Sequence, residues 1–128
     1  MTTHTLEQAI NNLTKEIQMN HFSNVKDIDN KLAEIMAFNN YLVIRPLARL
    51  LEDNAQNDEA IFSIIHSIES FDDDVYIHEI INEFPYLVSK SPYWTTILLI
   101  RILNSDIARK CIIEKVSLTT PAIKNSIL

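Results

Sequence analysis

Four residues in the middle of the chain have side chains of the kind that bind metal ions. His66 and Glu69 lie three residues apart, and His78 and Glu79 follow shortly after. A spacing of three puts two side chains on one face of a helix, and zinc and di-iron proteins use such pairs as ligands. A complete site needs at least three converging protein ligands, and only one predicted helix offers a pair. We therefore expect packed or capping histidines, with no metal and no other cofactor.

Nucleophilic catalysis would require a cysteine or serine beside a base. Cys111 is the only cysteine and lies in the apolar run Cys111-Ile112-Ile113, where a free thiol usually behaves as a small hydrophobic group. No local motif pairs it, or any serine, with a histidine. The chain also contains no glycine, which phosphate-binding loops and nucleophile elbows need at fixed backbone positions. These features predict a binding protein and not an enzyme.

Charge is distributed unevenly along the chain. Between Glu52 and Glu83 there are ten carboxylates and no Lys or Arg. The preceding and following segments have net charges of 0 and +4, so this segment of −10 sets the overall charge of −6. A field of one sign attracts a basic protein partner and repels nucleic acid. The alternative is a solvated face whose acids favour helix N-termini, and the sequence leaves both interpretations open.

The carboxylates of this segment are the candidate partner-binding residues. They are Glu52, Asp53, Asp58, Glu59, Asp72, Asp73, Asp74, Glu79 and Glu83. The tenth acid, Glu69, has a different predicted role. Arg101 lies in an otherwise apolar helix, where an isolated buried charge is costly, and Glu69 is its natural counterion. We therefore predict a structural ion pair between Arg101 and Glu69.

The elements that position these residues are predicted to be helices. Apolar residues recur at helical spacing in segments 6–17, 25–36, 42–51, 58–68 and 76–84. Ser23 is the expected N-cap of the second helix, and Pro46 is expected to start or kink the third. Pro85 and Pro92 are expected to bracket a connection. Ser105 or Asp106 should cap the helix that ends near residue 116, and Thr120 should cap a short last helix.

Segment 94–103 is apolar on nearly every face, which is typical of a buried helix. We expect it at the centre of the fold, where two groups of side chains form the core: Trp94, Ile97, Leu98 and Ile102 from this helix, and Ile64, Ile65 and Ile68 from segment 58–68. The short linkers favour antiparallel neighbours. The predicted fold is all-α, with antiparallel hairpins stacked in an irregular HEAT-like bundle of about seven or eight helices. We expect one domain over residues 1–128.

The location of the protein is predicted from what the chain lacks. No stretch approaches the roughly 18 uninterrupted apolar residues of a membrane span, and residues 1–11 have neither a basic segment nor an apolar signal core. A single cysteine fits a reducing compartment. We therefore expect a cytoplasmic protein that binds neither a membrane nor nucleic acid.

Several stretches resemble a known family. The segment DEAIFSIIHSIE spans Asp58 to Glu69, Tyr76-Ile77 continues it, and Ser91-Pro-Tyr-Trp94 precedes LIRILNS at 99–105. Over roughly residues 40–115 the chain resembles the bacterial immunity protein 30 family. The resemblance implies a small helical cytosolic protein that binds and inhibits the toxic C-terminal domain of a polymorphic or contact-dependent inhibition toxin, often a nuclease. It implies no catalytic residues.

Three functions are compatible with these observations. The first is a toxin inhibitor whose acidic segment covers a basic, RNA-binding active cleft. The second is a helical-repeat adaptor that joins two cellular proteins and has no toxin partner. The third is an enzyme with a metal site around His66, Glu69 and His78, which metal analysis of the purified protein would reveal. A gene immediately downstream of a large toxin gene would favour the first. The sequence does not determine the oligomeric state.

Overall fold

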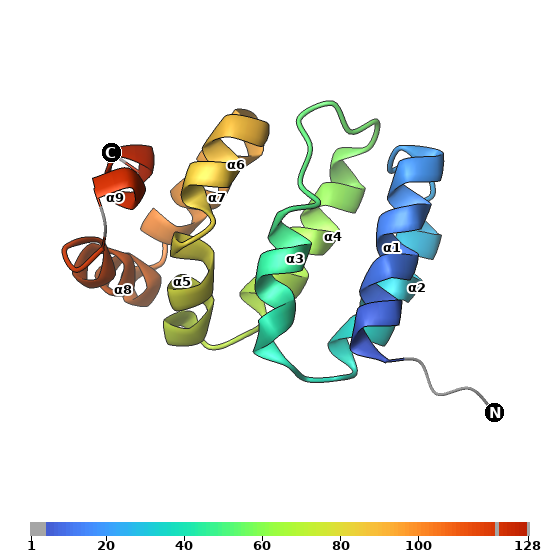
Figure 1. The fold of residues 1–128 in the computed structure, drawn as a ribbon, viewed down its shortest axis with the longest axis horizontal. Coiled ribbons are helices and arrows are strands. Elements are labelled where there is room, and N and C mark those ends of the chain that lie inside the picture. Colours follow the sequence, from blue (N-terminus) through green and yellow to red (C-terminus); the bar gives the residue numbers. More distant parts are fainter. Residues whose placement is uncertain (1–4, 120, 128) are drawn as a thin grey trace.

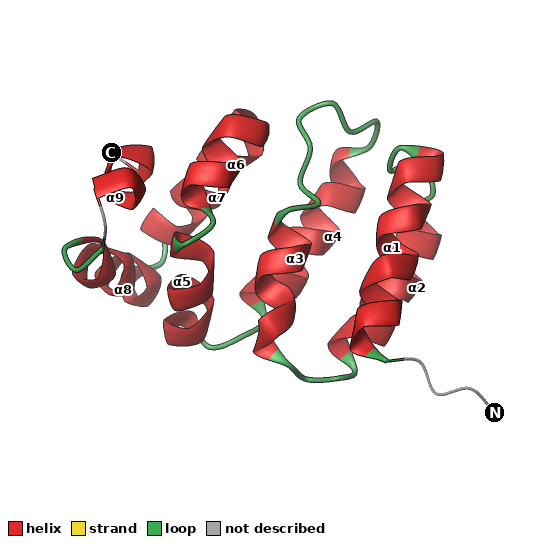
Figure 2. Cartoon of the chain, in the orientation of Figure 1, coloured by secondary structure: helices red, strands yellow, loops and turns green. Residues whose placement is uncertain are grey.

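The structure is a computed structural model that describes residues 5–119 and 121–127. Within those residues every regular element is helical, with nine α-helices, one short 3-10 helix and no strand (Figure 2). The all-α prediction is therefore confirmed. None of the described helices is both long enough and apolar enough to cross a membrane.

The helices follow one another along a row. They are α1 (Leu6–Asn20), α2 (Val25–Met36), the 3-10 helix η1 (Tyr41–Val43), α3 (Ile44–Ala48), α4 (Asp58–Glu69), α5 (Asp73–Ile81), α6 (Phe84–Lys90), α7 (Pro92–Leu103), α8 (Asp106–Val116) and α9 (Pro121–Ile127). Figure 1 shows α1 and α2 at one end of the row and α8 and α9 at the other. Between them α2 packs on α4, α3 on α5, and α5 on α8. The expected stack of helical hairpins is confirmed.

Polar side chains fix several of the helix starts. Ser105 caps α8, as predicted, by accepting a hydrogen bond from a backbone N–H of the first turn. The cap of α2 is Asn24, so the prediction of Ser23 is wrong by one residue. His21 and Phe22 both have left-handed backbone conformations, with φ of 51° and 67°. They lengthen the turn after α1, which delays the start of α2.

The prolines begin helices. Pro46 lies in the first turn of α3, which is one of the two roles predicted for it. The prediction that Pro85 and Pro92 bracket a connection is wrong, because these prolines lie in the first turns of the helices α6 and α7. Proline fits there since a first-turn N–H has no acceptor within its own helix. The N-cap expected at Thr120 lies outside the described residues.

The core is a cluster of buried apolar side chains. Among the residues expected at its centre, Ile97 is partly exposed and the others are buried: Ile64, Ile65, Ile68, Trp94, Leu98 and Ile102. The prediction that α7 is buried on nearly every face is wrong, because Tyr93 and Ile100 are 55% and 51% exposed. α7 packs against α6 and α8 near the C-terminal end of the row, which leaves one of its faces in solvent.

Candidate partner-binding surface

The two histidines with metal-ligand spacing lie on different helices. His66 on α4 is exposed, and its ring centroid lies 6.2 Å from that of Phe62. His78 on α5 is also exposed, and its backbone carbonyl accepts a hydrogen bond from Asn82 at 3.0 Å. In residues 5–119 and 121–127, no three His, Cys, Asp or Glu side chains converge closely enough to hold a metal ion. The described part of the chain offers no support for a metallo-enzyme.

Glu69 and Arg101 form the predicted ion pair. The Arg101 guanidinium donates from Nε and from a terminal nitrogen to the two Glu69 carboxylate oxygens, at 2.8 and 2.6 Å. These hydrogen bonds raise the pKa of Arg101. The side chains of Arg101 and Glu69 are 36% and 24% exposed, so the pair is less buried than the sequence predicted. It ties the end of α4 to α7.

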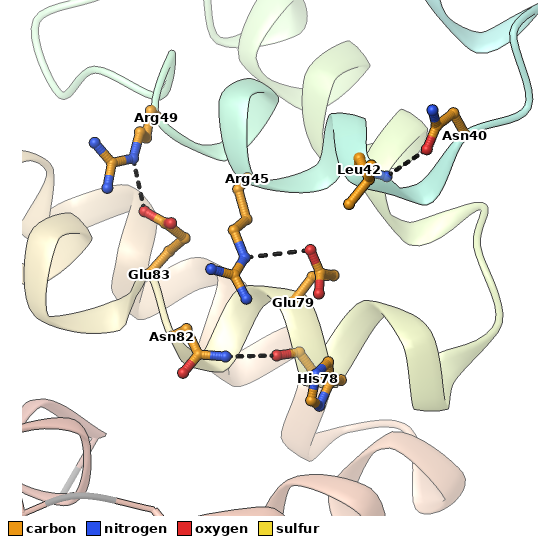
Figure 3. Close-up of polar contacts among 8 residues, drawn as sticks. All are labelled: Asn40, Leu42, Arg45, Arg49, His78, Glu79, Asn82 and Glu83. Atoms are coloured by element: carbon orange, nitrogen blue, oxygen red, sulfur yellow. Dashed lines mark hydrogen bonds and ion pairs between the residues drawn. The ribbon is translucent and has the colours of Figure 1, made fainter.

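Two of the candidate carboxylates are buried in ion pairs between helices (Figure 3). Arg45 Nε lies 3.2 Å from Glu79 Oε1, and Arg49 Nε donates to Glu83 Oε2 at 2.8 Å. The carboxylate side chains are only 7% and 6% exposed. Their cations come from α3 and the residue after it, outside the acidic segment, which is why the local charge count did not reveal them. Glu79 and Glu83 are therefore not part of a freely exposed acidic surface.

Asp53 has a structural role at the start of α7. Its carboxylate accepts hydrogen bonds from the backbone N–H groups of Tyr93 at 3.0 Å and Trp94 at 3.2 Å. The N-cap residue of α7, Ser91, makes no side-chain capping bond of its own and instead donates its hydroxyl to the carbonyl of Leu51. Asp53 therefore caps α7 from a distant part of the chain.

The remaining acids form two separate groups. Asp58 and Glu59 lie in the first turn of α4, with the partly buried Glu52 in the preceding loop. Asp72, Asp73 and Asp74, here called the acidic turn, lie at the start of α5. Because the 12-residue helix α4 lies between them, these groups lie at its opposite ends (Figure 1), separated by about 18 Å. The acidic segment is therefore not one continuous surface.

The acidic turn keeps most of its negative charge. Asp74 is 81% exposed and lies 3.5 Å from Lys115 on α8. Asp72 occupies the N-cap position of α5 but makes no side-chain capping bond. Neither Asp72 nor Asp73 forms an ion pair with any residue that the structure describes. This turn therefore presents uncompensated carboxylates to solvent.

A cleft of about 360 Å³ opens beside the acidic turn. Its lining side chains come from α4, α5, α7, α8 and the turn between α7 and α8: Glu69, Asp73, Tyr76, Arg101, Ile102, Asn104, Ser105 and Ala108. Tyr76 is 3% exposed, and its hydroxyl makes no hydrogen bond within the described structure. The apolar spacing of segment 76–84 predicts only a core position for Tyr76. A tyrosine in place of a phenylalanine at a core position between acidic residues is the sequence signal for its polar role.

Exposed apolar side chains lie at the end of α7 and the start of α8. Ile100 and Leu103 on α7 and Ile107 on α8 are exposed, while Arg101, Asn104 and Ser105 between them line the cleft. Exposed aliphatic groups next to uncompensated charge are a composition that protein–protein interfaces use, with an apolar centre and a polar rim. The α7–α8 segment, whose second helix packs on α5, therefore offers apolar side chains for contact with a protein partner.

The comparison with known proteins identifies one family. The model of the immunity protein 30 family matches residues 15–112. The matched range begins inside α1 and ends inside α8, so it includes the acidic turn and all the residues that line the cleft. No curated protein and no solved structure matches the chain.

Proposed function

Since the chain belongs to the immunity protein 30 family, we propose that it binds and neutralises the toxic C-terminal domain of a bacterial polymorphic or contact-dependent inhibition toxin. The match over residues 15–112 is the observation that carries this proposal. The toxin domain is expected to be a basic nuclease, and the protein to act in the cytoplasm by binding alone, without catalysis or a cofactor. Its charge pattern supports a basic partner.

The proposed contact is centred on the acidic turn. Asp72 and Asp73 lack a cationic partner among the described side chains, so their field extends into solvent and attracts a basic surface. A nuclease cleft that binds phosphates would accept these carboxylates in place of its substrate. Ile100, Leu103 and Ile107 are exposed and adjacent in sequence to cleft-lining residues of α7 and α8, and they would supply the apolar contact that slows dissociation.

Asp58 and Glu59, the other group of acids, would make only a secondary contact with the toxin domain. Asp58 and Glu59 are exposed in the first turn of α4 but lie at the opposite end of that helix from the acidic turn. Both groups would contact one toxin domain only if it covered the length of α4. Asp53, Glu79 and Glu83 support the contact indirectly, because they hold α3, α5 and α7 in place.

The test begins by asking whether a large toxin gene lies immediately upstream of the gene for this chain, and it uses the C-terminal toxin domain which that gene encodes. The domain is expressed from an inducible promoter in a host strain, alone or together with the chain, and growth is recorded after induction. We expect growth arrest without the chain, growth with it, and a complex of the two purified proteins. A toxin domain from an unrelated system is the matched control and should still arrest growth.

Two results would contradict the proposal. One is growth arrest that co-expression does not relieve, combined with no complex between the purified proteins. The other is stable binding to a host protein and none to the toxin domain, which would favour the helical adaptor.

A further inference from the structure

We propose that the cleft beside the acidic turn is a socket for one cationic side chain, a lysine or an arginine, of the partner domain. The inference rests on the proposed function, because the toxin domain would provide that side chain. The inference goes further by identifying the residues that receive this side chain: Asp73 and Tyr76, beside the pair of Glu69 and Arg101. The acidic turn would then guide the partner from a distance, and the socket would hold it after contact.

The cleft has room for a long side chain. Its volume of about 360 Å³ is at the lower end of the range for ligand clefts. The walls come from α4 and α5 on one side and from α7 and α8 on the other. The pair between Glu69 and Arg101 fixes the distance between α4 and α7. These walls stay in place when a partner binds, while the buried Tyr76 hydroxyl has to turn towards the cleft to meet the incoming group.

Tyr76 provides the observation that points to a ligand. A buried hydroxyl without a hydrogen-bond partner is unfavourable, and the great majority of buried polar groups in native proteins are paired. Tyr76 lines the cleft, and its hydroxyl is unpaired among the residues that the structure describes. Burial, followed by the charge of Glu69, raises the pKa of Tyr76 well above its ordinary value. The phenol therefore stays neutral and can accept a hydrogen bond from an incoming ammonium or guanidinium group.

The charges around the cleft favour a cation over an anion. Arg101 is the one cationic residue in the lining, and both oxygens of Glu69 already hold it. Asp73 has no cationic partner in the described chain, so the lining has a surplus negative charge. The starts of α5 and α8 also face this region and by themselves would favour an anion. Asp73 and Asp74 in the first turn of α5, and Asp106 in that of α8, offset this effect.

The first experiment measures the affinity of the upstream-encoded toxin domain for three variants. Tyr76→Phe removes only the hydroxyl, and Asp73→Asn removes one charge without changing shape. We expect each to weaken the complex about tenfold, the usual effect of losing one hydrogen bond to a charged group. Tyr86→Phe is the matched control, because its ring stays in place beneath Arg49, and it should leave the affinity unchanged. Wild-type affinity in Tyr76→Phe and Asp73→Asn would overturn the socket and leave the proposed function standing.

The second experiment does not depend on the toxin. Ethylguanidinium chloride is titrated into the free chain at constant ionic strength, while the NMR signals of the Tyr76 ring are recorded and assigned with Tyr76→Phe. We expect a shift that saturates, that is absent in Asp73→Asn, and that sodium acetate does not reproduce. No saturable shift, or an equal shift with acetate, would overturn the socket. A saturable shift in a chain that neither binds the toxin domain nor protects cells would overturn the proposed function instead.

Discussion

The carboxylate of Asp53 holds the start of α7 by accepting a hydrogen bond from the backbone N–H of Trp94, a residue 41 positions later in the chain. The neighbouring N–H of Tyr93 binds the same carboxylate. An acid that the sequence marks as part of an exposed negative segment is therefore a helix cap in the folded protein. These hydrogen bonds connect the loop between α3 and α4 to α7, the helix that carries Trp94 and Leu98.

Removing this cap should destabilise the protein. Asp53→Ala leaves two first-turn N–H groups of α7 without their acceptor, and we expect the free energy of unfolding to fall by about 1 kcal/mol. Urea unfolding followed by circular dichroism measures the change. Asn54→Ala, at the exposed next position, is the control and should change the stability by less than about 0.5 kcal/mol. Equal effects of the two substitutions would show that Asp53 does not act as a cap.

The pair of Arg101 and Glu69 should contribute measurably but modestly to stability. Because the two side chains are 36% and 24% exposed, water compensates part of a lost charge, and each single substitution to alanine should cost about 1–2 kcal/mol. This is less than the cost of breaking a fully buried pair. The double substitution should cost less than the sum of the singles, as a double-mutant cycle measures. Additive effects would show that the two side chains do not interact.

Leu98 and Ile100 lie two residues apart on α7 in opposite environments, which makes them a matched test of the core. Leu98 is fully buried, so Leu98→Ala should cost about 2–5 kcal/mol through lost burial and a cavity. Ile100 is half exposed, so Ile100→Ala should cost much less, about 1 kcal/mol or below. Chemical denaturation of both variants gives the comparison. A cost below about 0.5 kcal/mol for Leu98→Ala would contradict the observed packing of α7.

The acidic turn should control the rate at which the partner associates. Asp72→Lys with Asp74→Lys reverses two charges at the proposed contact, while Asp58→Lys with Glu59→Lys makes the same change in net charge at the far end of α4. We expect the first pair to slow association at low salt about tenfold and to reduce its salt dependence, and the second to have little effect. Stopped-flow binding at two salt concentrations distinguishes them. Equal slowing by both pairs would indicate a response to total charge and not to a local contact.

The thiol of Cys111 should react slowly with alkylating reagents near neutral pH. Burial, followed by the charges of Asp74 and Asp73, raises the pKa of Cys111, and only the thiolate is a strong nucleophile. The pH profile of iodoacetamide alkylation should therefore have its midpoint above that of an ordinary cysteine. Asp73→Asn with Asp74→Asn should lower the midpoint, but only in part, because burial is the larger cause. A midpoint at the ordinary value in the unmodified chain would contradict this prediction.

The sequence alone determined the helical class, the positions of most helices and much of the core. These properties depend on short-range patterns: apolar spacing of three and four residues, capping side chains such as Ser105, and the lack of glycine for hairpin turns. The pair of Arg101 and Glu69 was also predictable, because a charge in an apolar helix needs a counterion. The boundary between α6 and α7 could not be predicted, because a proline at a helix start and a proline in a connection look alike in sequence.

Only the tertiary structure decided what the individual carboxylates do. Glu83 and its cation Arg49 are 34 residues apart, and their meeting depends on how α3 packs against α5. The lack of a hydrogen-bond partner for the Tyr76 hydroxyl among the described residues also depends on how helices distant in sequence pack together. A side chain's spacing along a helix predicts which face it occupies, but the packing of distant helices determines which groups it meets there.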